Sequence, residues 1–389
     1  MTVNQEQTST MRSPAIVFAM TGAAGLHGGI AVVNLNIIIA LVAIARAHNV
    51  LLTVLAYHEK DDDRPASLPD GVEYRAFRSN RYAMAMDLWR RSSDKPLFVF
   101  DHVNVARALL PLALLGHSRT AIFAHGWENW RTVKWTDSWS LRSAERVLAN
   151  SEFTRKKIKA RFPNARVAAC PLGLHPGFHL NVTPPGPASE PLSLPDCNGV
   201  IRQLGQRVLL LAARMDPTER QKGHLEVLAV LPRVLAQHPG VQLVFTGSGG
   251  DHENLVSEVR RLHLGSQVFL PGQVAVTVLQ ALFRQCYAFV MPSTQEGFGL
   301  VYLEAMNAAK PCLGCFDQGT EDVIEHGVTG VLVRDPRNQD ELAGAILGLL
   351  DDAEGARAMG QRGFERLHTL FTAEKFRERF TTQINEILA

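Results

Sequence analysis

Short apolar runs recur along the chain and alternate with amphipathic or polar stretches. In the first half these runs cover residues 15–19, 50–56, 96–100, 120–124, 146–149 and 165–169. In the second half they cover 208–212, 242–246, 268–270, 288–292, 311–316 and 331–333. Helical patterns occupy 30–47, 225–237, 342–350 and 373–388. Strands that alternate with helices are typical of parallel, doubly wound sheets, so two such series predict two similar α/β domains with a cleft between them.

The length of 389 residues agrees with two domains of nearly equal size. Residues 181–199 are rich in Pro, Ser and Gly and indicate a linker or a long surface loop. We therefore expect an N-terminal domain over 1–180 and a C-terminal domain over 200–371. The charged amphipathic helix over 372–389 is expected to pack back on the first domain.

The composition, 46% hydrophobic and 20% charged, is that of an ordinary soluble globular protein. The net charge of +2 is unevenly divided, with +6 in residues 1–200 and −4 in the remainder. Two interpretations stay open: the first half meets an anionic partner such as a lipid headgroup or a phosphorylated acceptor, or the imbalance reflects solvated faces.

Targeting signals are not apparent, and we expect a cytoplasmic protein. Residues 1–13 are polar, and the apolar stretch 37–45 is too short to span a bilayer. The five cysteines form an odd, scattered set, as reduced thiols do. Cys312 and Cys315 have a redox or zinc spacing but lie in the apolar run 311–316, which favours a buried strand. A peripheral membrane contact stays open.

The segment "TGAAGLHGG", residues 21–29, lies between a predicted strand and a predicted helix, as phosphate-binding loops do. Gly22, Gly25 and Gly28 also have the spacing of some NAD-dependent reductases and epimerases. A short-chain enzyme of that type needs a Tyr with a Lys four positions on, and none of the five tyrosines has one. The loop is better explained by a close backbone approach to a sugar nucleotide, and the dinucleotide enzyme is kept as an alternative.

The segment "EGFGLVYLEAMNAAKPCL", residues 296–313, carries the strongest chemical signal. It predicts Glu296 in a strand-to-helix loop, a helix start near Gly299, and Glu304 more than one turn into the helix. Amides at a helix start suit a phosphate, and the two carboxylates can approach one ligand from different depths. Upstream, Arg214 and Lys222 flank a loop at the carboxyl edge of the sheet and can neutralise a diphosphate.

These motifs, together with Gly247-x-Gly249 and "FLPGQV" at 269–274, resemble the large glycosyltransferase family 4. The resemblance is tight over residues 207–333 and looser in the first half, where "HGG" at 27–29, "HG" at 125–126 and "ANSEFTRKKI" at 149–158 carry it. It implies the GT-B fold, in which two Rossmann-like doubly wound domains face a central cleft. It also implies a retaining transferase that uses a nucleoside-diphosphate sugar, for which we expect a UDP- or GDP-sugar, and no further cofactor.

The resemblance also implies residue roles. The residues expected to contact the donor are Gly28, Gly29, Gly247, Gln273, Val274, Gly297, Phe298, Gly299, Leu300 and Glu304. The residues expected to act in catalysis are Arg214 and Lys222 on the diphosphate and Glu296 and His125 on the transferred sugar.

Four of the five tryptophans fall within residues 127–139, interspersed with charged residues. Tryptophan faces stack on sugars and also lie at membrane interfaces. We assign Trp127, Trp130 and Trp135 to the acceptor region. The basic cluster over 155–161 either forms a solvated helix face or contacts anionic lipid.

The combined prediction is a metal-independent, retaining glycosyltransferase that moves a hexose-type sugar to a glycan, lipid-linked or small-molecule acceptor. No nucleic acid is expected as a partner. The Asp61-Asp62-Asp63 run lies far from the donor motifs and is interpreted as surface. Besides the reductase or epimerase, a non-catalytic sugar-nucleotide binding protein and a relative that makes a soluble disaccharide or a phosphorylated product stay open.

Overall fold

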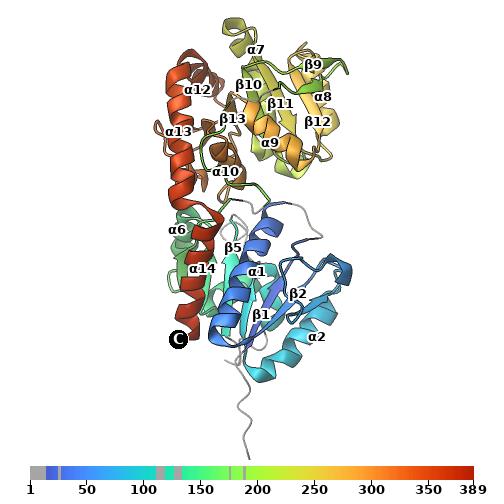
Figure 1. Ribbon diagram of the computed structural model, residues 1–389, viewed down its shortest axis with the longest axis vertical. Helices are drawn as coiled ribbons and strands as arrows, with labels where there is room; N and C mark the ends of the chain where they lie inside the picture. The colour runs from blue at the N-terminus through green and yellow to red at the C-terminus, as the bar shows by residue number, and fades with distance from the viewer. Residues whose placement is uncertain (1–14, 25–27, 111–118, 127–133, 175–176, 187–189) are drawn as a thin grey trace, which may run out of the picture. The chain divides into compact units, whose positions relative to one another are not determined.

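The computed structural model describes residues 15–24, 28–110, 119–126, 134–174, 177–186 and 190–389. Contacts divide the chain into two compact units (Figure 1). The first unit comprises 1–149, 158–168 and 377–389, and the second comprises 150–157 and 169–376. The expected boundaries at 180 and 200 stay a prediction; the units exchange short segments at 150–168 and at the C-terminal end.

The first unit is built on a seven-stranded sheet in the order β3-β2-β1-β4-β5-β6-β7. Its strands are β1 (Ala15–Met20), β2 (Leu51–Ala56), β3 (Glu73–Ala76), β4 (Leu97–Phe100), β5 (Arg119–Ala124), β6 (Arg146–Ala149) and β7 (Val167–Ala169). The inner strand β1 is parallel to both neighbours, with Val17 opposite Thr53 and Phe98. Such a strand is covered on both faces, which explains its continuous apolar run.

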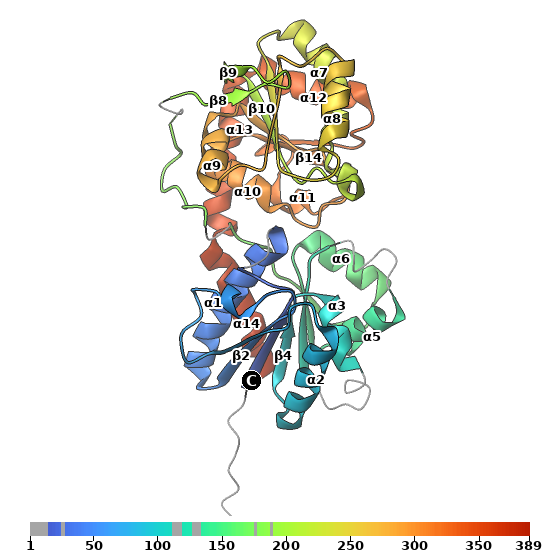
Figure 2. The same cartoon turned by 90° about the vertical axis from the view of Figure 1, so that its right-hand side faces the viewer.

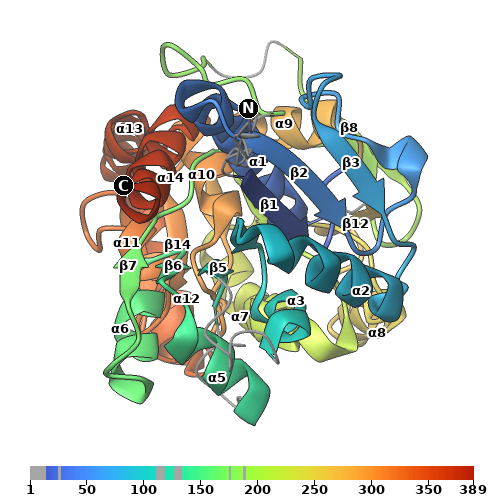
Figure 3. The ribbon, with the colours of Figure 1, turned by 90° about the horizontal axis from the view of Figure 1, so that it is seen from below.

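Helices cover both faces of this sheet. They are α1 (Gly29–His48), α2 (Arg81–Arg91), α3 (Val103–Ala106), α5 (Trp135–Ser143), α6 (Glu152–Arg161) and α14 (Ala373–Leu388), with short 3-10 turns η1 (Asp61–Asp63), η2 (Ser92–Asp94) and η3 (Arg107–Leu109). In the two turned views, α1 and α14 lie on one face and α2, α3 and α5 on the other (Figure 2, Figure 3).

Helix α1 is long and apolar, and its ends are set by local backbone chemistry. Gly28 precedes it with a φ of 112°, and Asn49 ends it in the left-handed region with a φ of 50°. By length and composition it is the one helix in the described ranges that could cross a membrane, with a mean hydropathy of 2.2. Of the apolar 18-residue stretch of α1, 61% is buried inside the fold, as in a core helix.

The last helix, α14, belongs to the first unit from residue 377 to its end. Arg146 donates to Glu386 at 2.9 Å, Arg119 donates to the carbonyl of Ile387, and Arg377 donates to Asn36 at 3.1 Å.

The second unit is built on a six-stranded sheet in the order β12-β11-β10-β13-β14-β15. Its strands are β10 (Val208–Ala212), β11 (Gln242–Thr246), β12 (Val268–Gly272), β13 (Ala288–Val290), β14 (Cys312–Cys315) and β15 (Gly330–Val333). Its helices are α7 (His224–Gln237), α8 (His252–Arg261), α9 (Val276–Gln285), α10 (Leu300–Asn307), α11 (Thr320–Val323), α12 (Gln339–Asp351) and α13 (Ala353–Leu370), with the 3-10 segment η5 (Pro217–Lys222). Helices α7, α8 and α12 lie on one side of the sheet and α9, α10 and α13 on the other (Figure 2). The predicted class, two doubly wound parallel α/β sheets, is confirmed.

The sequence pattern missed some elements. Edge strand β3 reads "EYRA" and is polar, and the expected linker over 181–199 ends in strand β8 (Ser193–Pro195). This strand pairs with β9 (Ile201–Gln203) in an antiparallel hairpin. Buried Asp196 organises the turn, since its carboxylate accepts from the amides of Asn198 and Val200 at 2.9 Å. Cys312 and Cys315 lie in buried β14, as predicted.

Candidate functional site

The strand order of the second sheet reverses between β10 and β13. These strands are parallel neighbours, with Leu209 opposite Ala288, so their carboxyl ends lie at the same edge. Arg214 and Lys222 follow β10, and Glu296 follows β13. Doubly wound sheets bind ligands at such a reversal, which makes this edge the candidate site.

Lys222 and Glu296 form an ion pair at this edge. The Lys222 Nζ lies 2.8 Å from Glu296 Oε2, and the two side chains are only 20% and 14% exposed. Burial disfavours the ammonium, but the Glu296 carboxylate outweighs burial and raises the pKa of Lys222 above its ordinary value. Lys222 is therefore held as a cation at the sheet edge.

Arg214 lies at the surface, with its side chain 71% exposed, and pairs with Glu219 of η5. The η5 segment is capped by Asp216, which accepts from the Thr218 amide at 2.9 Å. Part of the Arg214 guanidinium is therefore engaged, while the rest of this exposed side chain can meet a ligand.

Two glycines let the loop after β11 lie against the chain after β10. Gly247 and Gly249 have φ values of 140° and 152°. A Cβ would lie 2.0 Å from the Ala213 carbonyl oxygen in the first case and 2.1 Å from the Met215 carbonyl oxygen in the second. These distances leave no space for a side chain, so the close approach requires glycine at both positions.

The turn before α10 presents a helix start. Gly299 caps α10 with a φ of 91°, and a Cβ there would lie 2.4 Å from the Tyr302 ring. Buried Phe298 packs edge-on against Phe371, with ring centroids 5.6 Å apart. The backbone N–H groups at the start of a helix have no partner within it, and amides so placed can bind a phosphate.

Glu304 lies on α10, past its first turn. Its half-buried carboxyl has no hydrogen-bond or ion-pair partner within the described residues. Burial raises the pKa of Glu304 to about 8. Hydroxyl groups that donate hydrogen bonds to a carboxyl in this environment stabilise its ionised form.

Gln273 and Val274 follow β12 at the same sheet edge, because the Gly247 amide donates to the Gly272 carbonyl at 2.9 Å. Gln273 is exposed and Val274 half-buried. The residues of the second unit that are expected to bind the donor thus follow strands that end at one edge of the sheet, or lie at the start of α10 and within it.

In the first unit, Gly28 and Gly29 are exposed where α1 begins. His125 follows β5, and its Nε2 donates to the Asp101 carbonyl at 2.8 Å. Burial, with a further contribution from His102, lowers the pKa of His125 to about 3. This ring is neutral near pH 7.

Of the proposed acceptor residues, Trp127 and Trp130 lie outside the described residues. Trp135 begins α5 and is 69% exposed. It lines an open hollow with Ser138, Trp139, Arg142 and Ser143.

The basic cluster forms much of α6, and several of its cations have local partners. Arg155 pairs with Glu152 at 2.6 Å, Lys157 lies 4.9 Å from the Phe153 ring centroid, and Lys159 donates to the Pro163 carbonyl at 3.0 Å.

Several residues that support the site were not predicted from the sequence. The Gln318 side chain accepts from the Glu296 amide at 3.2 Å, and the Gly319 amide donates to the Glu296 carbonyl at 2.8 Å. A Cβ at Gly319 would lie 2.0 Å from the Gly297 oxygen. Burial and nearby Lys222 lower the pKa of His224 to about 4. Only the glycine within "DQGT" signalled any of these contacts in the sequence.

No group of three or more His, Cys, Asp or Glu side chains that could hold a metal ion occurs in the ranges that the structure describes. The expected metal independence stays a prediction.

Two family models match the chain. "Glycosyltransferase Family 4" matches residues 27–177, and "Glycosyl transferases group 1" matches residues 201–366. A Mycobacterium tuberculosis GDP-mannose-dependent alpha-(1-6)-phosphatidylinositol monomannoside mannosyltransferase is 30% identical over 281 residues, which cover 66% of this chain and 69% of the relative. The glycogen synthase of the same organism is 33% identical over 167 residues, or 43% of this chain, and the match spans only 39% of that enzyme.

Solved structures share the fold. Anabaena Alr3699/HepE in complex with UDP has a TM-score of 0.73 at 18% identity, with 96% of this chain and 100% of that chain covered. Sucrose-phosphate synthase from Thermosynechococcus elongatus has a TM-score of 0.75 at 19% identity, with 97% and 99% covered.

Proposed function

Because this chain belongs to glycosyltransferase family 4 with the GT-B fold, we propose that it transfers a hexose-type sugar from a nucleoside-diphosphate sugar to a glycan, lipid-linked or small-molecule acceptor. The transfer proceeds with retention and without a metal ion. UDP- or GDP-sugars are the proposed donors. Support comes from the neighbour solved with UDP and the GDP-mannose-dependent relative.

The Glu304 carboxyl, which has no hydrogen-bond or ion-pair partner among the described residues, is the observation that carries this proposal. It lies on the same helix whose first amides can meet a phosphate, and Lys222 adds a cation at the same sheet edge. Ribose offers two neighbouring hydroxyl donors for a carboxylate, and the diphosphate offers anionic oxygens for amides and cations. A nucleoside diphosphate fits this combination of groups.

We propose a front-face displacement. Arg214, Lys222 and the amides of 298–300 stabilise the charge that grows on the leaving diphosphate, and the leaving oxygen helps to take the acceptor proton. Glu296 binds hydroxyls of the transferred sugar, and neutral His125 contacts the same sugar. This route requires no protein nucleophile.

The reductase or epimerase alternative is weakened by the environment of Glu59. This acid follows β2, where a dinucleotide enzyme places the acid that binds the ribose. Here Glu59 is 1% exposed, and its carboxylate accepts from the Ala23 amide at 2.6 Å and from the Tyr74 hydroxyl at 2.8 Å. Its oxygens are occupied within the protein.

The acceptor class is proposed from the relatives, and the membrane contact from the exposed lysines of α6. A lipid-linked acceptor is favoured by the mannosyltransferase relative and a glycan by the glycogen synthase relative. We place the reaction in the cytoplasm. A peripheral membrane contact is supported by exposed Lys156 and Lys157 on α6.

A thermal-shift panel of UDP-, GDP-, ADP- and dTDP-sugars beside NADH tests the proposal. We expect one nucleoside diphosphate and its sugars to raise the melting temperature, and Glu304→Gln to remove most of that rise. A shift with NADH alone would overturn the proposal. Turnover of the stabilising donor then separates an enzyme from a binding protein, and product analysis separates glycolipid or glycan products from a soluble disaccharide.

A further inference from the structure

Segment 21–29 of the first unit, which we call the glycine loop, begins at residues that two buried carboxylates hold. The first sheet reverses its strand order between β1 and β4, and Thr21 and Asp101 directly follow these strands. Asp101 is fully buried. Its Oδ2 accepts from the Thr21 amide at 2.7 Å and from the Thr21 hydroxyl at 2.5 Å.

Asn34 extends this contact to helix α1. Its Nδ2 donates to Asp101 Oδ2 at 2.7 Å and to the Gly22 carbonyl at 2.8 Å. Asn34 is itself fully buried, and both of these bonds fix the orientation of its amide. The helix that follows the loop is thus tied to the carboxylate that holds the start of the loop.

Glu59 holds the next part of the loop. Its Oε1 accepts from the Ala23 amide, while Tyr74 of the edge strand β3 donates to Oε2. Asp101 and Glu59 therefore bind two loop amides that are two residues apart, from the ends of two different strands. We call Asp101, Asn34 and Glu59 the loop clamp.

The loop clamp also reaches His125, because the Asp101 carbonyl accepts from the His125 ring. One residue thereby fixes both the start of the glycine loop and the imidazole. Asp101 has no cationic side chain as an ion-pair partner in the described ranges, and burial raises its pKa. A buried acid without such a partner is a costly way to stabilise a turn, which points to a positioning role.

We propose that Asp101 and Glu59 are positioning residues for sugar transfer. They hold residues 21–23, where the glycine loop begins, and the main-chain carbonyl of Asp101 holds the His125 ring, in the geometry that the reaction needs. This inference rests on the proposed function, in which that loop and His125 act on the donor. Small displacements of reacting groups reduce rates strongly, so a loosened loop clamp lowers kcat.

The test compares Asp101→Asn and Glu59→Gln with the parent enzyme. We expect kcat to fall on the order of 10- to 100-fold while the Kd for UDP or GDP stays within about twofold. Arg214, Lys222 and Glu304, which the proposal assigns to the diphosphate and the ribose, lie in the second unit, and both changes leave that unit intact. Thr21→Val removes only one hydroxyl donor and should lower kcat less, with the same unchanged Kd. Thr21→Val also tests the positioning role if Asp101→Asn and Glu59→Gln fail to fold.

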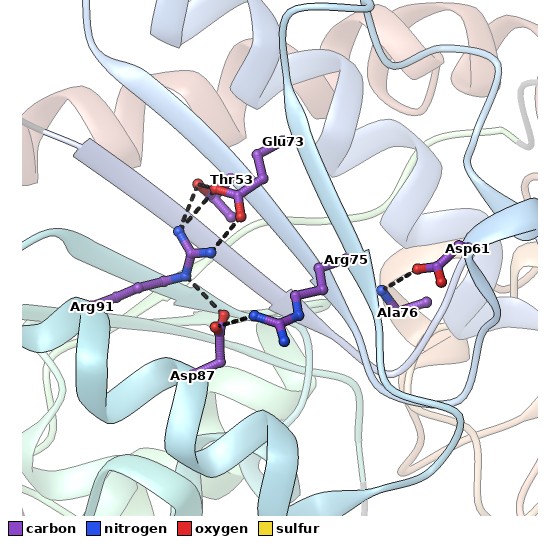
Figure 4. Close-up of polar contacts among 7 residues, drawn as sticks. All are labelled: Thr53, Asp61, Glu73, Arg75, Ala76, Asp87 and Arg91. Carbon is purple, nitrogen blue, oxygen red and sulfur yellow. Dashed lines mark hydrogen bonds and ion pairs between the residues drawn. The ribbon is translucent and has the colours of Figure 1, made fainter.

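Asp87→Asn is the matched control. Asp87 is a buried acid of the same unit, 5% exposed, and its carboxylate accepts from Arg75 at 2.7 Å and from Arg91 at 2.8 Å (Figure 4). This variant should lose stability but keep its kcat. Unchanged kcat in folded Asp101→Asn and Glu59→Gln overturns the positioning role, and so does an equal loss in Asp87→Asn. A parent protein that neither binds a nucleoside diphosphate nor turns over a donor rejects the proposed function itself, and the positioning role with it.

Discussion

The Lys222 ammonium lies 2.8 Å from the Glu296 carboxylate, although 74 residues separate the two in sequence. In the structure the proposed phosphate cation and the proposed sugar-binding carboxylate neutralise each other. A donor diphosphate that approaches Lys222 must share or displace this partner. The ion pair thus gives each residue a structural role that experiments have to separate from its chemical role.

The first prediction separates these roles. Lys222→Met leaves the Glu296 carboxylate without its cation and should lower the free energy of unfolding by about 1.5–3 kcal/mol, the range for hydrogen bonds to charged groups. Adding Glu296→Gln should restore part of that stability but none of the turnover. Urea unfolding and donor turnover on the parent, Lys222→Met and the double variant check this. A double variant that is no more stable than Lys222→Met contradicts the prediction.

The second prediction concerns the leaving group. Replacing Arg214 and Lys222 together with Ala should lower kcat about 10²- to 10³-fold, the size of an oxyanion-type contact, and weaken donor-sugar recognition less. Arg233→Ala is the control, because this surface arginine of the same unit, 51% exposed, pairs with exposed Asp340. Turnover of the double variant within a few-fold of the parent would show the assignment to be wrong.

The third prediction uses the pKa of Glu304, which burial raises to about 8 from its ordinary value of 4.5. The folded protein keeps a proton there that the unfolded chain releases, so the unfolding free energy falls as the pH rises from about 4.5 to 8. Glu304→Gln should flatten this slope.

Ribose hydroxyls favour the ionised form of Glu304, so nucleoside-diphosphate binding near pH 7 should release a proton and tighten as the pH rises towards 8. Calorimetry in buffers of different ionisation enthalpy measures the release. Glu304→Ala should abolish it and weaken binding about tenfold or more. The control is Glu253→Gln on α8, where the side chain is 90% exposed. Unchanged affinity in Glu304→Ala would remove this residue from the site.

The fourth prediction separates the acceptor from the donor. Trp135 is exposed on α5, so its change to Ala should leave the fold intact. We expect a higher acceptor KM and unchanged donor affinity, and the effect should grow when Trp130 is also changed. Stacking on one aromatic face contributes about 0.5–1.5 kcal/mol, which limits the loss.

His125→Ala should instead lower turnover with good and poor acceptors alike. Donor calorimetry beside acceptor kinetics checks both changes. Lost donor binding in the tryptophan variant, with intact acceptor kinetics, would refute the acceptor assignment.

The sheet edge that we propose to bind the donor could be predicted because its motifs are local in sequence. Gly299 precedes the helix start by one position, and Glu304 follows it within the same helix. Strand ends and helix starts fix where such residues lie in a doubly wound sheet. The apolar runs predicted the inner strands correctly, because a strand that is covered on both faces is continuously apolar.

Edge strand β3 was missed because tertiary contacts stabilise it. Its residues alternate between exposed and half-buried, and two of them are charged. Arg91 of α2 joins Glu73 at 2.5 Å and Asp87 at 2.8 Å, and Asp87 in turn binds Arg75 (Figure 4). Partners 12 and 18 residues apart leave no periodic signal.

The hydrogen bonds of the loop clamp could not be predicted from the sequence either. Thr21 and Asp101 are 80 residues apart, and Ala23 and Glu59 are 36 apart. Only the sheet order brings these strand ends together. The motif "TGAAGLHGG" indicated a loop that contacts phosphate but not what holds it.

The division of helix α14 at residue 376 has a consequence for biosynthesis. Residues 377–389 complete the first unit, where Glu386 binds Arg146 and Asn385 binds His48 at 3.0 Å. A ribosome makes them only after every residue of the second unit. Domains usually fold in the order of their synthesis. Here the N-terminal unit must wait for its last helix, so its seven-stranded sheet lacks part of its helical cover while the second unit is translated.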